Sequence, residues 1–366
     1  MNKNKVVFLT GVTGGLGREF LKLLLQKTDD RFFLLVRPRG PESHEKRVEK
    51  LLQKMGLNGE SRGRLRVLSG DITSPRLGLG PEDWQTVVRE TDEFYHSAAL
   101  TNLGAARDEA EQINLKGTLH CLELAREGRR KGKLERFYYF STAFVAGSLT
   151  PIHAQEDSLP EAPVFGNAYE ATKFQAERRV RDAAGEGLPV TIFRPSIVVG
   201  SSRDGAVSEF NVIYPFLRLF AHGILKQVPS DLDHSFNVVP IDFVVESSFA
   251  IARRPDSLGK TFHLVSERPP TLRMLLEIKE EYRGFPPVEV VPPEDFSVDS
   301  LSSEERNVFS TLQPYLGYLG STLTFDTTNT RSALKDTGIS FPRTDRAFLK
   351  KLVDYALSRG YFLPAF

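Results

Sequence analysis

A glycine-rich turn near the start of the chain places the strongest constraint on its fold. Residues 5–10, KVVFLT, have the composition of a buried strand, and GVTGGLGREF follows, with glycines at 11, 14 and 17 before a helical pattern. Gly11 permits a tight turn, Gly14 lets the backbone approach a phosphate, and Gly17 allows the helix to pack closely on the strand. The helix N-terminus offers unpaired N–H groups to an anion. The segment therefore predicts a site for the pyrophosphate of a dinucleotide, with the remaining turn residues Thr10, Thr13, Gly15 and Leu16 beside it.

The first two-thirds of the chain alternates short β-rich apolar runs with helical patterns. Further strands are expected at 31–37, 64–71, 93–99, 136–142, 188–196 and 260–266. Helices are expected at 18–27, 45–55, 113–128 and 170–184. This alternation is typical of an α/β protein with a Rossmann-type, doubly wound parallel sheet.

The alternation weakens after about residue 200, and 268–345 is rich in Pro, Ser, Thr and Phe. We therefore expect a dinucleotide-binding Rossmann domain of residues 1–200 plus 235–267, which the arginine described below makes an NADP-binding domain. A smaller, discontinuous substrate-binding lid is expected from residues 201–234 plus 268–366. The apolar and aromatic segment 209–229 lies in this lid. It either forms core or, as the family resemblance described below implies, lines a channel for an acyl chain.

Composition argues against several classes of protein. The formal net charge is +1, so bulk charge does not indicate a nucleic acid or an anionic membrane as partner. The single cysteine, Cys121, excludes a disulfide framework within the chain, and its helical apolar surroundings predict packing. The histidines form no i, i+4 pair beside a carboxylate, so no metal site is expected. Because there is neither a signal-peptide pattern nor an apolar run of ~20 residues, we expect a cytoplasmic protein without integral membrane association.

The end of the second strand indicates which dinucleotide binds. Sheets specific for NAD usually place Asp or Glu there to bind the ribose 2′-hydroxyl, whereas an arginine accommodates a 2′-phosphate. Here the strand ends LLVRPRG, with Arg37 at that position. A planar guanidinium can bind phosphate through two hydrogen bonds. The sequence therefore favours NADPH as cofactor.

A tyrosine and a lysine four residues apart suggest the chemistry. Tyr169 and Lys173, in NAYEATKFQAE, lie on one face of a predicted helix. A phenol is a poor acid near neutral pH, and a neighbouring ammonium makes its proton easier to transfer by stabilising the phenolate. The fifth strand ends in Ser141 and Thr142, and spacing to Gly147 favours Thr142 as the hydroxyl that donates to a substrate carbonyl. These residues predict reduction of a carbonyl group.

Over nearly its whole length the chain resembles the extended short-chain dehydrogenase/reductase family. The resemblance is carried by TGVTGGLG (10–17), Asp71-Ile72, HSAA (96–99), STAFVAG (141–147), YEATK (169–173) and RPSIVVG (194–200). It implies a catalytic triad of Thr142, Tyr169 and Lys173, with Asn114 holding a proton-relay water. It also implies that Asp71 and Ile72 flank the adenine, that Ala98 lines the cofactor channel, and that Pro195 and Ser196 lie near the nicotinamide.

A finer resemblance is to the thioester-reductase and fatty acyl reductase branch of that family. It rests on HSAALTNL (96–103), AEQINLKGT (110–118), TIFRPSIVVGSSRDG (191–205), NVVPIDFVV (237–245) and FDTTNTR (325–331). The branch uses NADPH, with Arg47 implied as a second contact to the 2′-phosphate. Its members reduce an acyl thioester on coenzyme A or a carrier protein, through a hemithioacetal, to an aldehyde, and some continue to an alcohol.

The resemblance leaves alternatives open. The sequence includes no adenylation domain, attached carrier or long C-terminal extension, so a thioester is expected to arrive in trans. Reduction of a lipid or natural-product ketone is the main alternative, and sugar-nucleotide epimerisation or dehydration is a weaker one. A redox-inactive binding module is disfavoured by the intact Thr142, Tyr169 and Lys173. We expect a small-molecule, carrier-bound or coenzyme A-bound acyl substrate, and a monomer or homodimer.

Overall fold

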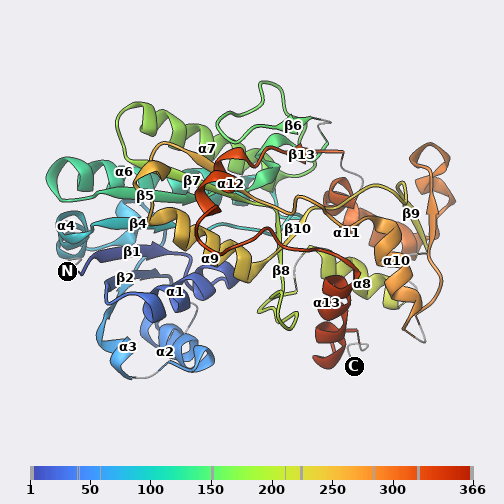
Figure 1. Ribbon diagram of the computed structural model, residues 1–366, viewed down its shortest axis with the longest axis horizontal. Coiled ribbons are helices and arrows are strands. Elements are labelled where there is room, and N and C mark those ends of the chain that lie inside the picture. Colours follow the sequence, from blue (N-terminus) through green and yellow to red (C-terminus); the bar gives the residue numbers. More distant parts are fainter. Residues whose placement is uncertain are drawn as a thin grey trace.

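Seven parallel strands form the central sheet of the protein. The computed structural model describes residues 4–38, 40, 42–57, 59–149, 152–210, 212–222, 226–282, 285–319 and 322–362. The strand order is β11-β7-β5-β4-β1-β2-β3. Figure 1 labels β7, β5, β4, β1 and β2 in this order. The bounds are β1 (Val6–Thr10), β2 (Arg31–Val36), β3 (Leu65–Ser69), β4 (Glu93–His96), β5 (Arg136–Phe140), β7 (Val190–Pro195) and β11 (Thr261–Leu264). The prediction of a doubly wound parallel sheet is confirmed, including the expected late strand, which extends the sheet beside β7.

Helices cover both faces of this sheet, because side chains alternate between two apolar layers along each strand. Val7 and Leu9 of β1 pack into one buried cluster, and Val6 and Phe8 pack into the other. The first layer is covered by α1 (Gly15–Lys27), α2 (His44–Met55), α9 (Ile241–Ala252) and α12 (Thr328–Leu334). The second is covered by α4 (Pro81–Glu90), α6 (Gly117–Lys131) and α7 (Ala168–Gly185). Cys121 of α6 is fully buried in this second layer, as its pattern predicted.

Several predicted strands end earlier than their composition indicated. The third strand ends at Ser69 instead of 71, the fourth at His96 instead of 99, and the fifth at Phe140 instead of 142. The residues that follow leave the hydrogen-bonded ladder at the carboxyl edge of the sheet. The strand order reverses there between β1 and β4, and such switch points are where open α/β sheets bind ligands.

A second group of elements forms its own apolar cluster beside that edge. It comprises β8 (Ile197–Val199), α8 (Ile213–Ala221), β9 (Gln227–Pro229), β10 (Val238–Pro240), α10 (Leu272–Glu280), β12 (Glu289–Val291), α11 (Ser303–Leu319) and α13 (Arg346–Ser358). Strand β8 pairs with β10, and β9 with β12. In the ambiguous aromatic segment, Tyr214 and Phe216 are 1% exposed within this cluster, so these two rings are core.

The chain then returns to the sheet. Strand β13 (Thr324–Phe325) pairs with β6 (His153–Ala154), and α12 contacts β11 and α9. The buried Glu156 carboxylate accepts hydrogen bonds from the His263 N–H at 2.8 Å and the Thr330 hydroxyl at 2.6 Å. The short elements are α3 (Gly59–Gly63), α5 (Arg107–Ala110), η1 (Pro75–Gly78), η2 (Glu111–Lys116), η3 (Ala143–Ala146), η4 (Pro255–Ser257), η5 (Pro293–Asp295) and η6 (Val298–Ser300).

The described residues contain neither a membrane-spanning helix nor a metal-binding cluster. None of their helices combines the length and apolar character needed to cross a bilayer. Within the same part of the chain, no group of three or more His, Cys, Asp or Glu side chains is arranged to hold a metal ion.

Candidate active site

A cavity of about 550 Å³ lies at the carboxyl edge of the sheet. All residues predicted to bind the cofactor line it, namely Thr10, Gly11, Thr13, Gly14, Gly15, Leu16, Gly17, Arg37, Arg47, Asp71, Ile72, Ala98, Tyr169, Lys173, Pro195 and Ser196. Thr142 lines it as well, whereas Asn114 does not. The fold therefore brings together side chains that are spread over about 190 positions of sequence.

The glycine turn has the geometry that a pyrophosphate site requires. Gly11 has φ +81°, in the left-handed region that favours glycine. A Cβ at Gly17 would lie 2.3 Å from the Gly11 carbonyl oxygen, so only glycine permits this approach of helix to turn. Helix α1 begins directly after Gly14, where no side chain caps its first N–H groups. Those groups remain available to an anion, and the turn fits a dinucleotide.

Two arginines and an aspartate form one end of the cavity, and Tyr169 and Lys173 lie at the other. The Arg37 guanidinium lies 3.4 Å from the Asp71 carboxylate, and Arg47 donates a hydrogen bond to the Arg37 carbonyl oxygen. Burial tends to raise the pKa of Asp71, but hydrogen bonds from Thr73 and the charge of Arg37 together lower it. The Arg37 side chain is 63% exposed, so it is free to turn toward a bound phosphate.

Helix α7 holds the tyrosine and the lysine. Asn167 caps it by accepting a hydrogen bond from the Glu170 N–H at 3.0 Å, which fixes the first turn, where Tyr169 lies. One turn further, Lys173 is 2% exposed, and its Nζ donates to the Phe140 carbonyl oxygen at 2.7 Å. Burial lowers the pKa of Lys173 to about 7, despite the opposing charge of Glu177. The lysine therefore changes its protonation state near neutral pH.

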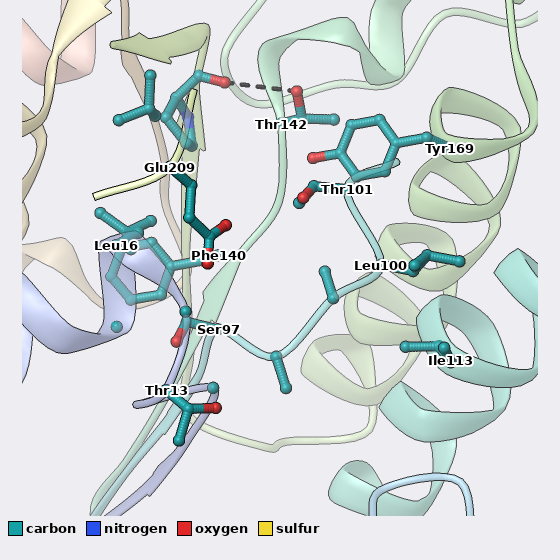
Figure 2. A pocket seen from close by; sticks show the side chains of 18 of the residues that line it. Thr13, Leu16, Ser97, Leu100, Thr101, Ile113, Phe140, Thr142, Tyr169 and Glu209 are labelled. Carbon is teal, nitrogen blue, oxygen red and sulfur yellow. Dashed lines mark hydrogen bonds between the residues drawn. The ribbon is translucent and has the colours of Figure 1, made fainter. Parts of the chain in front are cut away.

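Tyr169 and Thr142 meet across the cavity. Figure 2 shows the Tyr169 ring and the Thr142 side chain pointing into the same space. Burial raises the pKa of Tyr169 to about 12, a hydrogen bond with Thr142 opposes this rise, and the Glu170 charge adds to it. The Thr142 hydroxyl also lies 3.4 Å from the Pro195 carbonyl oxygen, which is a long hydrogen bond. Tyr169 is therefore a protonated phenol at neutral pH, as a proton donor must be.

A buried ion pair supports this end of the site from behind. Glu177, one turn after Lys173, is 0% exposed and pairs with Arg194 at 2.6 Å. It also accepts a hydrogen bond from the Ser141 hydroxyl at 2.6 Å. Burial tends to raise the pKa of Glu177, but Arg194, with smaller contributions from Arg181 and Ser141, lowers it to about 2. The Ser141 hydroxyl thus already donates its hydrogen bond to the Glu177 carboxylate, while the Thr142 hydroxyl faces Tyr169.

Asn114 lies behind the cavity wall in η2, a π-helical turn. Its Oδ1 accepts a hydrogen bond from the Leu100 N–H at 2.8 Å, and its Nδ2 donates to the Leu100 carbonyl oxygen at 3.2 Å. The same Nδ2 lies 3.1 Å from the Thr172 hydroxyl of α7. In the structure Asn114 therefore connects the loop after β4 to the catalytic helix.

Sequence reasoning did not identify several residues that line the catalytic end. Thr101 follows HSAAL, the segment that begins at the end of β4. Its position shortly after a strand end is the sequence feature that could have identified it as a candidate site residue. Glu209 reaches the cavity from the segment after β8 (Figure 2). Tyr318 of α11 packs edge-on against Phe144, with ring centroids 4.4 Å apart. Glu209 and Tyr318 come from segments without a periodic pattern, so only the fold reveals them.

Comparison with known proteins shows the family. A family model described as "Male sterility protein" matches residues 9–248. The chain belongs to this family, within the thioester-reductase and fatty acyl reductase-like branch of the extended short-chain dehydrogenases/reductases. The branch consists of NAD(P)-dependent oxidoreductases, so a nicotinamide cofactor is expected for this chain.

Three individual proteins illustrate this similarity. A nonribosomal peptide synthetase of Aspergillus flavus is 28% identical over 365 residues, covering 91% of this chain and 34% of the synthetase. A fatty acyl-CoA reductase of Drosophila melanogaster is 29% identical over 286 residues, covering 68% of this chain and 54% of that protein. The crystal structure of the terminal R domain from the myxalamid PKS-NRPS biosynthetic pathway has a TM-score of 0.84 and 28% identity, and covers 100% of this chain and 94% of that chain. The chain thus spans about a third of the synthetase and about half of the reductase.

Proposed function

We propose that the protein reduces the carbonyl group of an acyl thioester to an aldehyde with NADPH. The observation that carries the proposal is the convergence of Thr142, Tyr169 and Lys173 at one end of the dinucleotide cavity. The similarity to a fatty acyl-CoA reductase and to a terminal R domain supports a thioester as the substrate class. Coenzyme A or a carrier protein would present the acyl group.

The choice of NADPH rests on the arginine end of the cavity. Arg37 and Arg47 both line it, and no acidic residue replaces Arg37 at the end of β2. The nearby Asp71 is paired with Arg37, so it does not present an unpaired charge to a phosphate. The glycine turn would hold the pyrophosphate, and Tyr169 and Lys173 would lie near the nicotinamide ribose.

Each residue of the catalytic end has a separate role in the proposed reduction. Bound NADPH supplies a hydride to the acyl carbon. Tyr169 donates its proton to the carbonyl oxygen, and Thr142 donates a hydrogen bond to the same oxygen. The Lys173 ammonium lowers the free-energy cost of the resulting phenolate. When the hemithioacetal collapses, the phenolate takes back the hydroxyl proton as the C–S bond breaks. The aldehyde and a thiolate leave, and the thiolate takes up a proton from water to become the thiol.

The wall opposite the sheet is proposed as the binding surface for the acyl chain. Phe144, Val212 and Tyr318 face the cavity and belong to, or pack against, the second apolar cluster. This agrees with a substrate-binding lid in residues 201–234 plus 268–366, which we retain as a proposal.

The decisive experiment follows NADPH oxidation at 340 nm with a panel of acyl-CoAs, fatty aldehydes and cyclic ketones. We expect turnover with acyl-CoAs, and product analysis then shows whether reduction stops at the aldehyde or continues to the alcohol. Turnover of ketones without turnover of any thioester would overturn the proposed substrate class. NADH tested at the same concentrations separates the two cofactors.

A further inference from the structure

The loop after β4 presents a third hydroxyl to the catalytic end of the cavity. Thr101 lines the same cavity as Thr142 and Tyr169, and its side chain is exposed there. Figure 2 shows the Tyr169 hydroxyl between the side chains of Thr142 and Thr101. The proposed reduction uses the hydroxyls of Tyr169 and Thr142 and not this third one.

The hydrogen-bonding capacity of the Thr101 hydroxyl is unused within the part of the chain that the structure describes. Among the described residues, no backbone or side-chain group forms a hydrogen bond with its hydroxyl, in contrast to the hydroxyls of Ser141 and Thr142. Ser141 donates to Glu177 at 2.6 Å, and Thr142 accepts from the Phe144 N–H at 3.3 Å. Thr101 therefore keeps both its donor and its acceptor for a molecule in the cavity.

The position of Thr101 is fixed although its hydroxyl is free. Both backbone groups of the preceding residue, Leu100, are hydrogen-bonded by the Asn114 amide at 2.8 and 3.2 Å. Asn114 is 1% exposed and also bonds to Thr172, the neighbour of Lys173 on α7. The loop and the catalytic helix are thus fixed through one buried side chain. Such a preorganised donor loses little entropy when it binds a ligand.

We propose that the Thr101 hydroxyl donates a hydrogen bond, alongside Thr142 and Tyr169, to the oxygen of the carbonyl group that is reduced. The inference rests on the proposed function, because it needs a carbonyl substrate at this end of the cavity. The carbonyl oxygen gains negative charge as hydride reaches the carbon. An oxygen with alkoxide character has three lone pairs, so it can accept from all three hydroxyls. Thr101 then stabilises the transition state more than the ground state.

The test compares Thr101→Val, which removes the hydroxyl with little change in shape, with Thr101→Ser, which retains it. Thr86→Val on α4 is the matched control, because Thr86 does not line the cavity. Turnover is measured with an acyl-CoA and with a fatty aldehyde, and NADPH affinity is measured separately from the fluorescence of the bound nucleotide. A thermal melt of each variant checks folding.

We expect Thr101→Val to lower kcat roughly 10- to 100-fold, the usual effect of losing one hydrogen bond to a charged group. KM and NADPH affinity should stay within about twofold, and Thr101→Ser should recover most of the activity. Equal kcat for wild type and Thr101→Val would overturn the role of Thr101 and leave the proposed function intact, as would a Thr101→Ser variant as impaired as the valine. A wild-type protein that reduces neither substrate would overturn the proposed function and, with it, this inference.

Discussion

The two ends of the cavity use charge in opposite ways. At the dinucleotide end the Arg37 side chain is 63% exposed, and its contact with Asp71 is 3.4 Å long. At the catalytic end Lys173 is 2% exposed, and the supporting pair of Glu177 and Arg194 is 0% and 1% exposed. The charged side chain of the first end lies in water, whereas the charged side chains of the second are already shielded from water before any ligand arrives.

This difference has physical consequences. Charges in water interact weakly and are screened by salt, so an exposed arginine contributes little until a phosphate arrives. Buried charges are costly to leave unpaired, and the cost appears as shifted pKa values and as sensitivity to substitution. The catalytic end should therefore respond strongly to small chemical changes, and the dinucleotide end to salt and to charge reversal.

Removal of the Tyr169 hydroxyl should produce the largest effect on turnover. Tyr169→Phe deletes the proton donor and leaves the ring in place, so we expect kcat to fall roughly 10²- to 10⁴-fold. NADPH affinity, measured from nucleotide fluorescence, should change by less than about threefold. A variant that turns over at the wild-type rate would exclude Tyr169 as the acid.

Breaking the buried ion pair should produce the largest effect on stability. Arg194→Met leaves the Glu177 carboxylate buried without its main partner, and we expect a loss of about 3–5 kcal/mol in the free energy of unfolding. Urea denaturation measures this loss. A loss below about 1 kcal/mol would show that Arg181, which also pairs with Glu177 at 2.9 Å, suffices alone.

Acid should destabilise the protein through two buried imidazoles. Burial lowers the pKa of both His96 and His263 to about 3, from 6.5. Between these pH values the two side chains together bind about two more protons in the unfolded chain than in the folded protein, so their contribution to stability falls as pH drops from about 6.5 toward 3. Each proton contributes about 1.4 kcal/mol per pH unit. His96→Asn should reduce by about half the slope of unfolding free energy between pH 6 and 5, and an unchanged slope would contradict this assignment.

Reversing the charge at the exposed end should change cofactor choice. Arg37→Asp should weaken NADPH binding roughly 10- to 100-fold and leave NADH binding within about threefold, since only NADPH carries the 2′-phosphate. For wild type, NADPH affinity should also decrease as salt is added from 0.05 to 0.5 M. Titrations of both nucleotides at two salt concentrations test this, and equal weakening of both would remove the case for a 2′-phosphate site.

A surface ion pair should produce the smallest effect and serves as the control for the buried one. Arg66 lies 2.7 Å from Asp83, with side-chain exposures of 50% and 38%. Arg66→Met should change the free energy of unfolding by less than about 1 kcal/mol, because water already solvates both charges. If urea denaturation showed that Arg66→Met loses as much free energy of unfolding as Arg194→Met, burial would not be the cause of the difference between the two ends of the cavity.

Much of the candidate site could be predicted from the sequence because it depends on local chemistry. The turn at Gly11, Gly14 and Gly17 needs glycine for steric reasons that neighbouring residues alone set. The four-residue spacing of Tyr169 and Lys173 places them on one helix face whatever surrounds the helix. Parallel strands then bring their carboxyl ends to one edge, which explains why residues from so many segments were expected at one site.

Other features required the tertiary structure. Within the segment 209–229, the fold buries Tyr214 and Phe216 in the core and places Glu209 and Val212 at the cavity, and no period in the sequence carries that information. The contact of Asn114 with Leu100 joins a π-helical turn to a loop 14 residues away, and only the fold places them together. The placement of the Thr101 side chain beside Tyr169 likewise depends on how the loop after β4 lies at the cavity.

The sequence by itself determined the doubly wound sheet, the glycine turn and the helix that carries tyrosine and lysine, because each follows from short-range sterics and periodicity. Only the tertiary structure decided how far each charge is buried, and therefore the pKa of Lys173 near 7 and of Glu177 near 2. Burial is a property of the packed molecule, since the residues that exclude water from a side chain come from distant parts of the chain. The dinucleotide end could therefore be predicted from local motifs, while the electrostatics of the catalytic end could not.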